Sequence, residues 1–424
     1  MQAFAVVDCD NFYVACERVF DPRLARRPVV VLSNNDGCVI SRSEEAKGLG
    51  IRMGAPLFQI RALTEAQGVS VFSSNYALYG DMSRRVMETL ASLTPEVEVY
   101  SIDEAFLGLG RRREARLTDY GHEVRERVRR WTGLPVSVGI APTKTLAKLA
   151  VGVAKRSGTE SVCHLGGARA IEEVLARTPV EEVWGVGRRL TRMLRGEGIA
   201  SALDLTRADD GFIRRRMRVT GLRVVQELRG TPCLPLELCP PPRRSVTVSR
   251  SFGRAIESPE DLCEAVAYFT ARAAEKLRSA RLAAGVLLVF LATNRFDSGA
   301  QYEGSAVVNL PVPTALTPEL IGYARRAAAD AFRPGLRYKK AGVMLLELVP
   351  ETPAQGGLFD RVERERVRRV LAAVDAINRR MGADTVRFAS SGLKSRTQAW
   401  RALCERRSPR YTTRWDELLR LSAR

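Results

Sequence analysis

Two adjacent carboxylates, Asp103 and Glu104, lie inside an apolar run at residues 100–106 (YSIDEAF). An ionised group is costly to bury without a partner, so a fold that contains this run must supply a cation beside it. A third acid, Asp8, ends the apolar run at residues 4–7, which predicts a buried strand. If the two strands are neighbours, three acids converge. The alternative is that these acids are solvated at the ends of unrelated strands.

The composition limits what such a cluster could bind. The chain has only two histidines, His122 and His164, and both lie in polar stretches. Imidazole catalysis and histidine-ligated metals are therefore disfavoured. Acidic oxygens without histidine favour a hard cation such as Mg²⁺.

The charge balance points to a polyanionic partner. The 67 Lys and Arg residues outnumber the 48 Asp and Glu residues, which gives a net charge of +19. Nucleic acid is the natural candidate for such a basic chain. The alternative is an arginine-rich proteome, in which arginine occupies ordinary solvated faces. Arginine runs such as 111–113 and 214–216 fit both interpretations.

Cysteine usage and hydropathy predict a soluble, cytoplasmic protein. The eight cysteines are scattered without a C-x-x-C pair, which argues against zinc ribbons and against a disulfide framework. No signal peptide is evident at the start of the sequence. The longest apolar run, residues 286–293, is too short to span a bilayer.

The local patterns predict several domains. Up to about residue 165, apolar strands alternate with amphipathic helices, as in an α/β domain. Residues 166–230 carry only short helices, and the sequence VWGVGRRL at 183–190 resembles a helix-hairpin-helix that could grip phosphate, although an ordinary tight helix turn is equally consistent with it. The predicted strands are 4–8, 28–33, 97–102 and 136–140, and the predicted helices are 75–91, 116–131 and 143–155.

A proline-rich stretch, residues 232–242, predicts a linker. The order after it is strand, helix, strand, strand, helix, strand, which is the split βαβ arrangement. Beyond Pro350 the chain becomes polar and glycine-containing, with a further helix at about 361–381. The predicted strands are 244–250, 285–293, 304–310 and 339–349, and the predicted helices are 259–281 and 317–332.

Several ordered motifs together resemble the Y-family of damage-bypass DNA polymerases. They are the Asp8 strand with Phe12-Tyr13, the segments 33–40 (SNNDGCVI), 72–76 (FSSNY) and 100–106, and the helix from Lys144 to Lys155. Within that family the chain is most similar to the UmuC-type catalytic subunits of bacterial DNA polymerase V. The tail segment 408–415 (SPRYTTRW) is also characteristic of that subgroup.

The resemblance implies an α+β, multidomain, right-hand polymerase. A ferredoxin-like palm would comprise 1–10 and 75–165, with fingers at 11–74 and a helix-hairpin-helix thumb at 166–230. A linker at 231–242 would lead to a βαββαβ little finger at 243–350. The C-terminal tail, 351–424, would hold a clamp-binding peptide and a partner-interaction region.

The resemblance also implies the catalytic residues. Asp8 and Asp103 would bridge two Mg²⁺ ions, Glu104 would complete the site that activates the primer 3′-hydroxyl, and the Cys9 backbone carbonyl would bind the nucleotide-side ion. Adjacent side chains of a regular strand point to opposite faces, so the chain must bend at Asp103-Glu104. Asp10 shares a face with Asp8, but the family position is not a ligand.

Other residues match the family's substrate contacts. Tyr13 resembles the steric gate that excludes the ribose 2′-hydroxyl, although it could be an ordinary aromatic at the start of a helix. Lys47 and Lys155 match the triphosphate-binding positions, although either could be a solvated helix lysine. Glu44 departs from the family, because many relatives carry a triphosphate-binding tyrosine there, and Arg42 is a candidate substitute.

The tail carries Gln355, Leu358 and Phe359, which resemble the clamp-binding peptide of bacterial polymerases. The Leu-Phe pair could instead fold back onto the protein. The resemblance implies primer-template DNA, a dNTP and the sliding clamp as partners, with a processed UmuD-type dimer and a RecA filament, no membrane, and a nucleoid-associated location in the cytoplasm.

The function expected is low-fidelity, template-directed translesion synthesis in the SOS response. A non-catalytic DNA-binding accessory subunit on the same fold is one alternative, and the intact Asp8, Asp103 and Glu104 argue against it. Another palm-type nucleotidyl transferase, such as a cyclic-nucleotide synthase, is a second alternative. Such an enzyme would not need the predicted thumb, linker and basic little finger.

Overall fold

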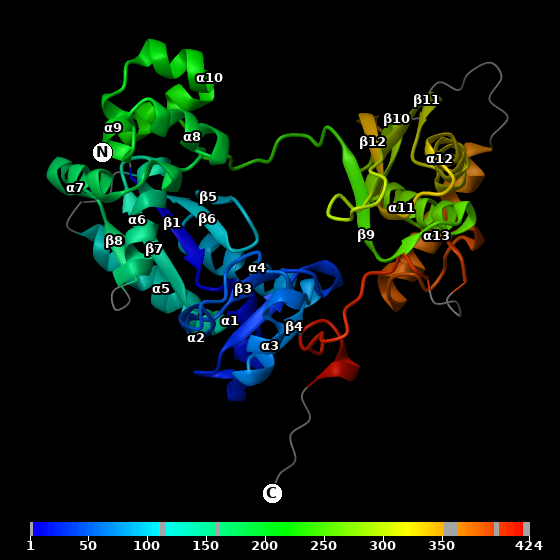
Figure 1. The fold of residues 1–424 in the computed structure, drawn as a ribbon, viewed down its shortest axis with the longest axis horizontal. Coiled ribbons are helices and arrows are strands. Elements are labelled where there is room, and N and C mark those ends of the chain that lie inside the picture. The colour runs from blue at the N-terminus through cyan, green and yellow to red at the C-terminus, as the bar shows by residue number, and fades with distance from the viewer. Residues whose placement is uncertain (1–2, 111–115, 158–160, 352–362, 394–397, 419–424) are drawn as a thin grey trace, which may run out of the picture. The chain divides into compact units, whose positions relative to one another are not determined.

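The computed structural model describes residues 3–110, 116–157, 161–351, 363–393 and 398–418. The chain forms two compact units, shown in Figure 1. Unit 1 comprises residues 1–33, 37–240 and 406–424, and unit 2 comprises 34–36 and 241–405. Within the described ranges, none of the helices combines the length and apolar character that crossing a bilayer requires.

Unit 1 is built on a five-stranded sheet with the strand order β5-β6-β1-β7-β8. Alternate side chains of its central strand face opposite sides, as the strand geometry requires. Ala5 and Val7 enter one hydrophobic core, whereas Phe4 and Val6 enter another. The strands are β1 (Phe4–Cys9), β5 (Val97–Val99), β6 (Glu104–Gly108), β7 (Val136–Ala141) and β8 (Val162–His164).

Helices cover both faces of this sheet (Figure 1). Helix α5 (Leu117–Thr132) shares the core of Ala5 and Val7 with α4 (Tyr76–Ala91) and α1 (Phe12–Phe20). Helix α6 (Lys144–Ser157) packs against the opposite face, in the core of Phe4 and Val6. The sheet therefore presents its strand ends between two helical layers.

The predicted strand 97–102 differs from the structure. Strand β5 ends at Val99, residues 100–103 form a turn, and β6 begins at Glu104 and runs back antiparallel to β5. The Tyr100 and Ser101 amides both donate to the Glu104 carbonyl, at 3.1 and 3.0 Å. The two carboxylates thus lie at a hairpin turn and not within one continuous strand.

A smaller three-stranded sheet lies between β1 and α4 in the sequence. Its strand order is β3-β2-β4, and β2 pairs antiparallel with β3 and parallel with β4. Val30, Leu32, Val39 and Ile51 form its own small core. The elements are β2 (Val29–Leu32), β3 (Val39–Arg42), α2 (Glu44–Gly48), α3 (Leu57–Ala66) and β4 (Ser70–Ser73).

Short helices follow β8, as the sequence predicts, and share the core on the α6 side of the large sheet. Residues 229–245 then lack regular structure. Glu227 and Glu98, both buried, hold the first part of this segment through the amides of Cys233, Leu234 and Glu237. The helices are α7 (Ala168–Arg177), α8 (Arg188–Gly196), α9 (Ala202–Arg207) and α10 (Asp210–Leu228).

Unit 2 contains a four-stranded antiparallel sheet with the order β11-β10-β12-β9. Two helices pack against it, and the order along the chain is the predicted βαββαβ. The elements are β9 (Val246–Ile256), α11 (Pro259–Ser279), β10 (Leu282–Thr293), β11 (Glu303–Thr314), α12 (Thr317–Ala331) and β12 (Tyr338–Pro350).

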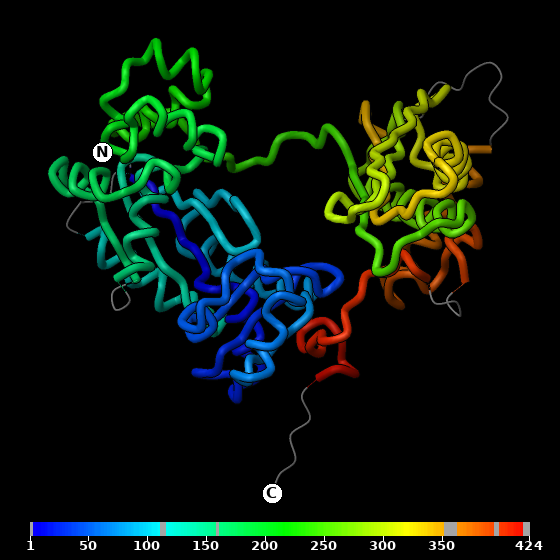
Figure 2. The backbone as a smooth tube through the Cα atoms, in the orientation of Figure 1, coloured from blue at the N-terminus to red at the C-terminus, as the bar shows by residue number. Residues whose placement is uncertain are grey.

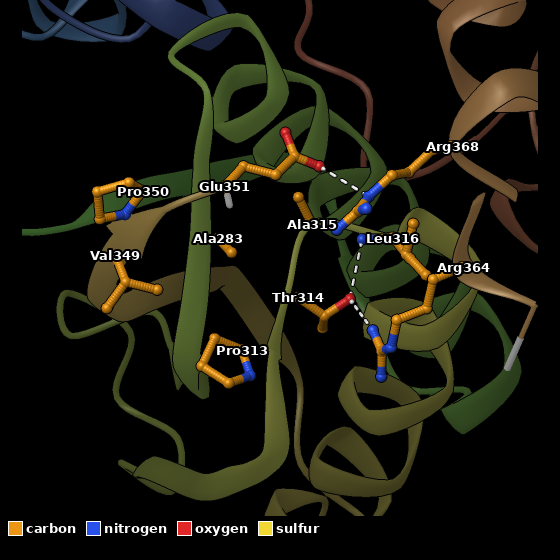
Figure 3. A pocket seen from close by; sticks show the side chains of 10 residues that line it. All are labelled: Ala283, Pro313, Thr314, Ala315, Leu316, Val349, Pro350, Glu351, Arg364 and Arg368. Carbon is orange, nitrogen blue, oxygen red and sulfur yellow. Dashed lines mark hydrogen bonds and ion pairs between the residues drawn. The ribbon is translucent and has the colours of Figure 1, made fainter. Parts of the chain in front are cut away.

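Helix α13 (Arg364–Met381) belongs to unit 2 and is held to the rest of it by ion pairs. Arg278 binds both Asp375 carboxylate oxygens, at 2.7 and 2.8 Å. Figure 3 shows a cavity of about 240 Å³ beside this helix, in which Arg368 lies 3.6 Å from the Glu351 carboxylate and Arg364 lies 3.4 Å from the Thr314 hydroxyl. Both arginines therefore already have partners within the protein.

The end of the described chain belongs to unit 1. Figure 2 shows this segment, in red, beside the blue N-terminal part of the chain. The ring of Tyr411 stacks on that of Phe20, with 4.9 Å between the ring centroids. The tail is thus divided between the two units, with residues 363–405 in unit 2 and residues 406–418 in unit 1.

Candidate active site

The backbone brings the three predicted acids to one end of the large sheet. Asp8 in β1 is the register partner of Glu104 in β6. The next amide along β1, that of Cys9, donates to the Asp103 carbonyl at 2.8 Å. Strands that are far apart in the sequence therefore place Asp8, Asp103 and Glu104 side by side, as neighbouring strands were expected to do.

Each carboxylate has its own partner in this structure. Asp8 lies 2.5 Å from the Lys155 ammonium, Asp103 accepts a bond from the Ser101 hydroxyl at 2.6 Å, and Glu104 lies 2.9 Å from the Lys148 ammonium. The part of the chain that the structure describes contains no group of three Asp, Glu, His or Cys side chains gathered as a ligand set for a metal ion. The carboxylates are adjacent, but their side chains are not converged on one point.

The electrostatics show that Asp8 lacks full compensation for its burial. Burial, together with the smaller effects of the neighbouring Glu104 and Asp103, raises the pKa of Asp8 to about 6 against the lowering effect of Lys155. A buried carboxylate with too little positive charge beside it is stabilised by a cation. The donors are all oxygens, which suits Mg²⁺. The residues present therefore fit a divalent ion.

Lys148 is a site residue that the sequence reasoning missed. Its ammonium lies 4.3 Å from the ring centroid of Tyr100 and 5.2 Å from that of Trp184, within cation–π range, as well as beside Glu104. The Trp184 indole donates to the Tyr100 hydroxyl at 3.0 Å. The spacing of Lys144, Lys148 and Lys155 along one helix is the signal that could have identified it.

Tyr13 lies near the acids, on the first turn of α1. Its ring stacks on Tyr79, with 4.5 Å between centroids and 21° between planes, and meets Tyr76 edge-on at 6.2 Å. Burial raises the pKa of Tyr13, and the charges of Tyr76 and Asp103 raise it further. The Tyr13 ring is therefore packed against other rings, and the negative charge of Asp103 acts on the Tyr13 hydroxyl.

A cleft of about 830 Å³ in unit 1 brings together Lys47 from α2 and Lys155 from α6. Arg18 and Arg156 line the same cleft. Basic side chains from three helices thus line this space together with the acids Asp10 and Glu44. Lys155 connects the cleft to Asp8, with which it is paired. The space is large enough to hold the phosphates of a nucleotide.

The departure at Glu44 has a local explanation. The Glu44 carboxylate accepts bonds from the Lys47 ammonium at 2.6 Å and from the Asn11 amide at 3.0 Å, and the bond from Lys47 lowers the pKa of Glu44. Arg42 donates to the Ile51 carbonyl. Glu44 therefore occupies Lys47 in this structure, and Arg42 is directed at the protein's own backbone.

Two further predictions have different outcomes. Gly185, in the suggested helix-hairpin-helix, adopts a φ of +88° in the turn before α8, where only glycine is unstrained. Phosphate binding at this turn stays a prediction. Gln355, Leu358 and Phe359 lie outside the described residues.

Family models match most of the chain. The impB/mucB/samB family model matches residues 7–152, and the model of that family's C-terminal domain matches residues 243–358. A model described as a domain of unknown function matches residues 368–421.

Known proteins are similar over nearly the whole length. The chain is 45% identical to Protein UmuC of Salmonella typhimurium over 423 residues, which covers 99% of this chain and 100% of that protein. It is 44% identical to Protein ImpB of Salmonella typhimurium, with 98% of each chain covered. DNA polymerase IV of Caulobacter vibrioides is 29% identical, with 91% of this chain and 93% of that protein covered.

A solved structure has the same fold. A Y-family DNA polymerase chimera superposes with a TM-score of 0.69 at 18% sequence identity, and the match covers 82% of this chain and 99% of the chimera.

Proposed function

This chain belongs to the impB/mucB/samB family and is a UmuC-type, Y-family DNA polymerase that carries out translesion synthesis; we propose that Asp8, Asp103 and Glu104 are the carboxylates with which it does so. The expected right-hand polymerase fold is confirmed by the structural match. The pairing of Asp8 with Glu104 across β1 and β6 carries the proposal.

The family depends on divalent metal and binds primer-template DNA. We infer two Mg²⁺ ions, held by Asp8, Asp103, Glu104 and the Cys9 carbonyl. Bound at these residues, the ions would supply positive charge to the attacking and leaving oxygens. The Asp8–Lys155 pair supports this inference. The Lys155 ammonium lies where a metal ion beside Asp8 would lie, and the raised pKa of Asp8 shows that this one positive charge does not fully offset the burial of the carboxylate.

The lysines then have a defined task. A cation beside Asp8 would free Lys155 from its 2.5 Å contact, and the freed ammonium could neutralise phosphate charge in the adjacent cleft. Lys47 would join it when phosphate competes with Glu44 for its ammonium. Tyr13, stacked on Tyr79, would exclude the ribose 2′-hydroxyl by contact.

We assign the palm to 1–10 and 75–165, the fingers to 11–74, the thumb to 166–230 and the little finger to 243–350, joined by the linker 231–242. The five-stranded sheet supports the palm, and the three-stranded sheet supports the fingers. Helices α7 to α10 support the thumb, and the βαββαβ sheet supports the little finger.

Isosteric loss of charge tests the site. The double variant Asp103→Asn/Glu104→Gln should lose primer extension in Mg²⁺ while its affinity for primer-template DNA persists, because the DNA-binding surfaces are unchanged. Asp119→Asn/Glu123→Gln, on the exposed face of α5, is the matched control and should extend normally. Extension by the Asp103/Glu104 variant at a rate comparable with the wild type would reject the assignment. Wild-type extension itself separates a polymerase from a non-catalytic accessory subunit.

The partners remain proposals. The similarity to Protein UmuC supports a processed UmuD-type dimer and a RecA filament as partners, and a location at the nucleoid follows from the DNA substrate. Primer extension opposite an abasic site, with and without these proteins, tests the dependence. For the sliding clamp, Leu358→Ala/Phe359→Ala should lower clamp affinity, since each apolar anchor contributes about 1.5–3 kcal/mol if buried in the partner. A large fall in melting temperature would instead show that the pair packs on its own chain.

A further inference from the structure

Residues 406–411, here called the C-terminal strap, are held by hydrogen bonds to the end of β4 within unit 1. The Ser73 amide donates to the Arg406 carbonyl at 3.1 Å, and the Arg406 amide donates to the Ser73 hydroxyl at 2.9 Å. Ser73 is the last residue of β4. The strap therefore starts where β4 ends, more than three hundred residues away in the sequence.

Asn75 holds the middle of the strap. Its buried amide nitrogen lies 2.9 Å from the Ser408 hydroxyl, 3.1 Å from the Ser408 carbonyl and 3.0 Å from the Pro409 carbonyl. Asn75 is also the N-cap of α4, where its side-chain oxygen accepts a bond from the Leu78 amide. One side chain thus ties the strap to the start of the helix that carries Tyr79.

Ser408 and Tyr79 converge on one buried carboxylate. The Ser408 hydroxyl donates to Glu17 Oε1 at 2.9 Å, and the Tyr79 hydroxyl donates to the same oxygen at 2.7 Å. Glu17 is 1% exposed and Tyr79 is fully buried. Hydrogen bonds to a buried charged acceptor are short and directional, so this arrangement fixes the orientation of the Tyr79 ring.

Tyr79 in turn supports Tyr13. The two rings are stacked, and Tyr13 lies one helical turn before Glu17 on α1, on the same helix face. Contacts therefore run without a break from Ser408 through Glu17 and Tyr79 to Tyr13. A steric gate excludes a substituent only if its ring cannot move away, which requires locked neighbours.

We propose that the C-terminal strap is a positioning element for Tyr13, and that discrimination against ribonucleotides depends on Ser408. This inference rests on the proposed role of Tyr13 as the gate. It gives a function to part of the region 368–421, which the family model leaves without one. Ser408 is a positioning residue, because it acts through Glu17 and Tyr79 and touches no substrate.

The test compares Ser408→Ala with Ser408→Thr in the full chain. We measure kcat and KM for the matching dNTP and rNTP in primer extension. Ser408→Ala should lower the dNTP-to-rNTP ratio of kcat/KM by about threefold to tenfold, the range expected for losing one net hydrogen bond. The change should come from better use of rNTP, with dNTP kinetics nearly unchanged. Ser408→Thr, which keeps the hydroxyl, should have the dNTP-to-rNTP ratio of the wild type.

The single variants Tyr13→Ala and Ser408→Ala and their combination separate this inference from the proposed role of Tyr13. If Tyr13→Ala leaves the ratio unchanged in an active enzyme, Tyr13 is not the gate and both ideas fail. If Tyr13→Ala lowers the ratio and Ser408→Ala does not, the strap proposal alone is overturned. Where both act, Tyr13→Ala/Ser408→Ala should match Tyr13→Ala, because the strap acts only through that ring.

A variant on α4, the helix that carries Tyr79, serves as the control for general effects on folding. Thr89→Ala removes a buried hydroxyl of α4 that bonds only the Arg85 carbonyl, and it should leave the ratio unchanged. Equal loss of dNTP and rNTP use in Ser408→Ala would indicate a merely structural role and overturn the proposal. If Ser408→Ala does not fold, Tyr79→Phe keeps the stacked ring and removes the hydroxyl that bonds Glu17, and an unchanged ratio in that variant would also overturn it.

Discussion

Lys148 and Lys144 differ in what their ammonium groups do, although both lie on the first turns of α6. Lys144 is paired with Glu98 inside the protein, with side chains only 4% and 8% exposed. Lys148 pairs with Glu104 at the candidate site, inside a box of Tyr100, Trp184 and Phe106. The first pair is structural, whereas the second positions a proposed metal ligand.

Substitution by methionine should separate the two roles. Lys148→Met leaves an apolar side chain in an aromatic box, so we expect the fold to persist while kcat falls by up to about a hundredfold, because Glu104 loses its orientation. Lys144→Met leaves the buried Glu98 charge unpaired and should cost about 3–5 kcal/mol of stability. Melting temperatures and single-turnover extension measure both. Equal effects on stability from the two variants would contradict this division.

Glu17 gives a pH-dependent prediction. Burial raises its pKa above the ordinary value of 4.5, against the lowering bonds from Tyr79 and Ser408. The stabilisation from a raised pKa is fully present below the unfolded value and is lost as the pH rises through the folded value. Glu17→Gln does not titrate and keeps an acceptor oxygen. The titratable groups that face Glu17 are Tyr79, Cys16, Asp21 and Tyr411.

Thermal unfolding at pH 5 and pH 8 checks this expectation. The melting temperature of Glu17→Gln relative to the wild type should be higher at pH 8 than at pH 5, since only the wild type carries the buried charge. Asp21 is ionised at both pH values, because its pKa is lowered by Arg23, and its effect cancels in the comparison. A difference that is constant with pH would mean that Glu17 does not titrate as inferred.

The residues of the site were predictable to different degrees. Asp8, Asp103, Glu104 and Tyr13 stand in local motifs, so the sequence could identify them. Glu17, Tyr79 and Ser408 form a contact set that spans 391 positions, and no local pattern announces it. Long-range polar contacts of this kind depend on tertiary folding and are therefore absent from motif reasoning.

At the level of elements, the turn at residues 100–103 shows what pattern reasoning loses. The apolar periodicity continues through the turn, so it predicted one strand. The turn is instead set by the Ser101 hydroxyl, which accepts from the Asp103 amide at 3.2 Å and donates to the Asp103 carboxylate. Serine commonly forms such local bonds in competition with strand pairing. The bend required at Asp103-Glu104 is thus a complete reversal of the chain.

The contact between β7 and α6 gives a prediction for the element that carries the lysines. A Cβ at Gly139 would lie 2.1 Å from the Val151 amide nitrogen and 2.4 Å from the Ala147 carbonyl oxygen, so the helix would have to move. Gly139→Ala should therefore cost about 1–3 kcal/mol and also reduce extension. Chemical denaturation and primer extension measure the two effects.

Gly152, on α6 itself, provides the control for Gly139 on β7. A Cβ there meets only the end of the Arg156 side chain, at 3.8 Å. Gly152→Ala should be neutral or stabilising by about 0.5–1 kcal/mol, because alanine is the better helix former. A Gly139→Ala protein as stable as the wild type would show that β7 and α6 do not pack this closely.

At the scale of the whole molecule, the sequence predicted a linker and a βαββαβ domain because both have local signatures. It treated 351–424 as one tail with a helix at about 361–381, whereas residues 363–393 and 398–405 belong to unit 2 and residues 406–418 to unit 1. Trp400, buried against Tyr268 and Phe269, anchors the first part. Polar, charged composition conceals such docking, because a few buried anchors suffice.

The basic residues that give the net charge of +19 differ in how much neighbouring negative charge offsets them. In unit 2, the pKa of Lys276 is lowered by burial and then by the positive charges of Arg250, Arg272 and Arg243. Of these four side chains, only Arg272 forms an ion pair within the described part of the chain, with Glu275 at 2.6 Å. Like charges gathered with so little compensation are costly in the free protein, and a polyanion relieves that cost. By contrast, Arg23 in unit 1 is paired with Asp21 at 2.9 Å. Arg250 and Arg23 therefore contribute equally to the net charge, but Arg250 lies among other positive charges whereas Arg23 is paired with an acid.

DNA binding should therefore fall steeply with salt, with a slope set by the local cluster and not by net charge. The logarithm of the association constant should fall linearly with the logarithm of KCl concentration, because each phosphate contact releases condensed counterions. Arg250→Ala should reduce the magnitude of that slope by about one contact. Arg23→Ala removes the same charge from an arginine that is already paired and should leave the slope unchanged. Fluorescence anisotropy over a KCl series measures all three proteins. An equal change of slope in both variants would mean that net charge alone governs binding, and a flat wild-type response would mean that the basic surplus does not contact DNA.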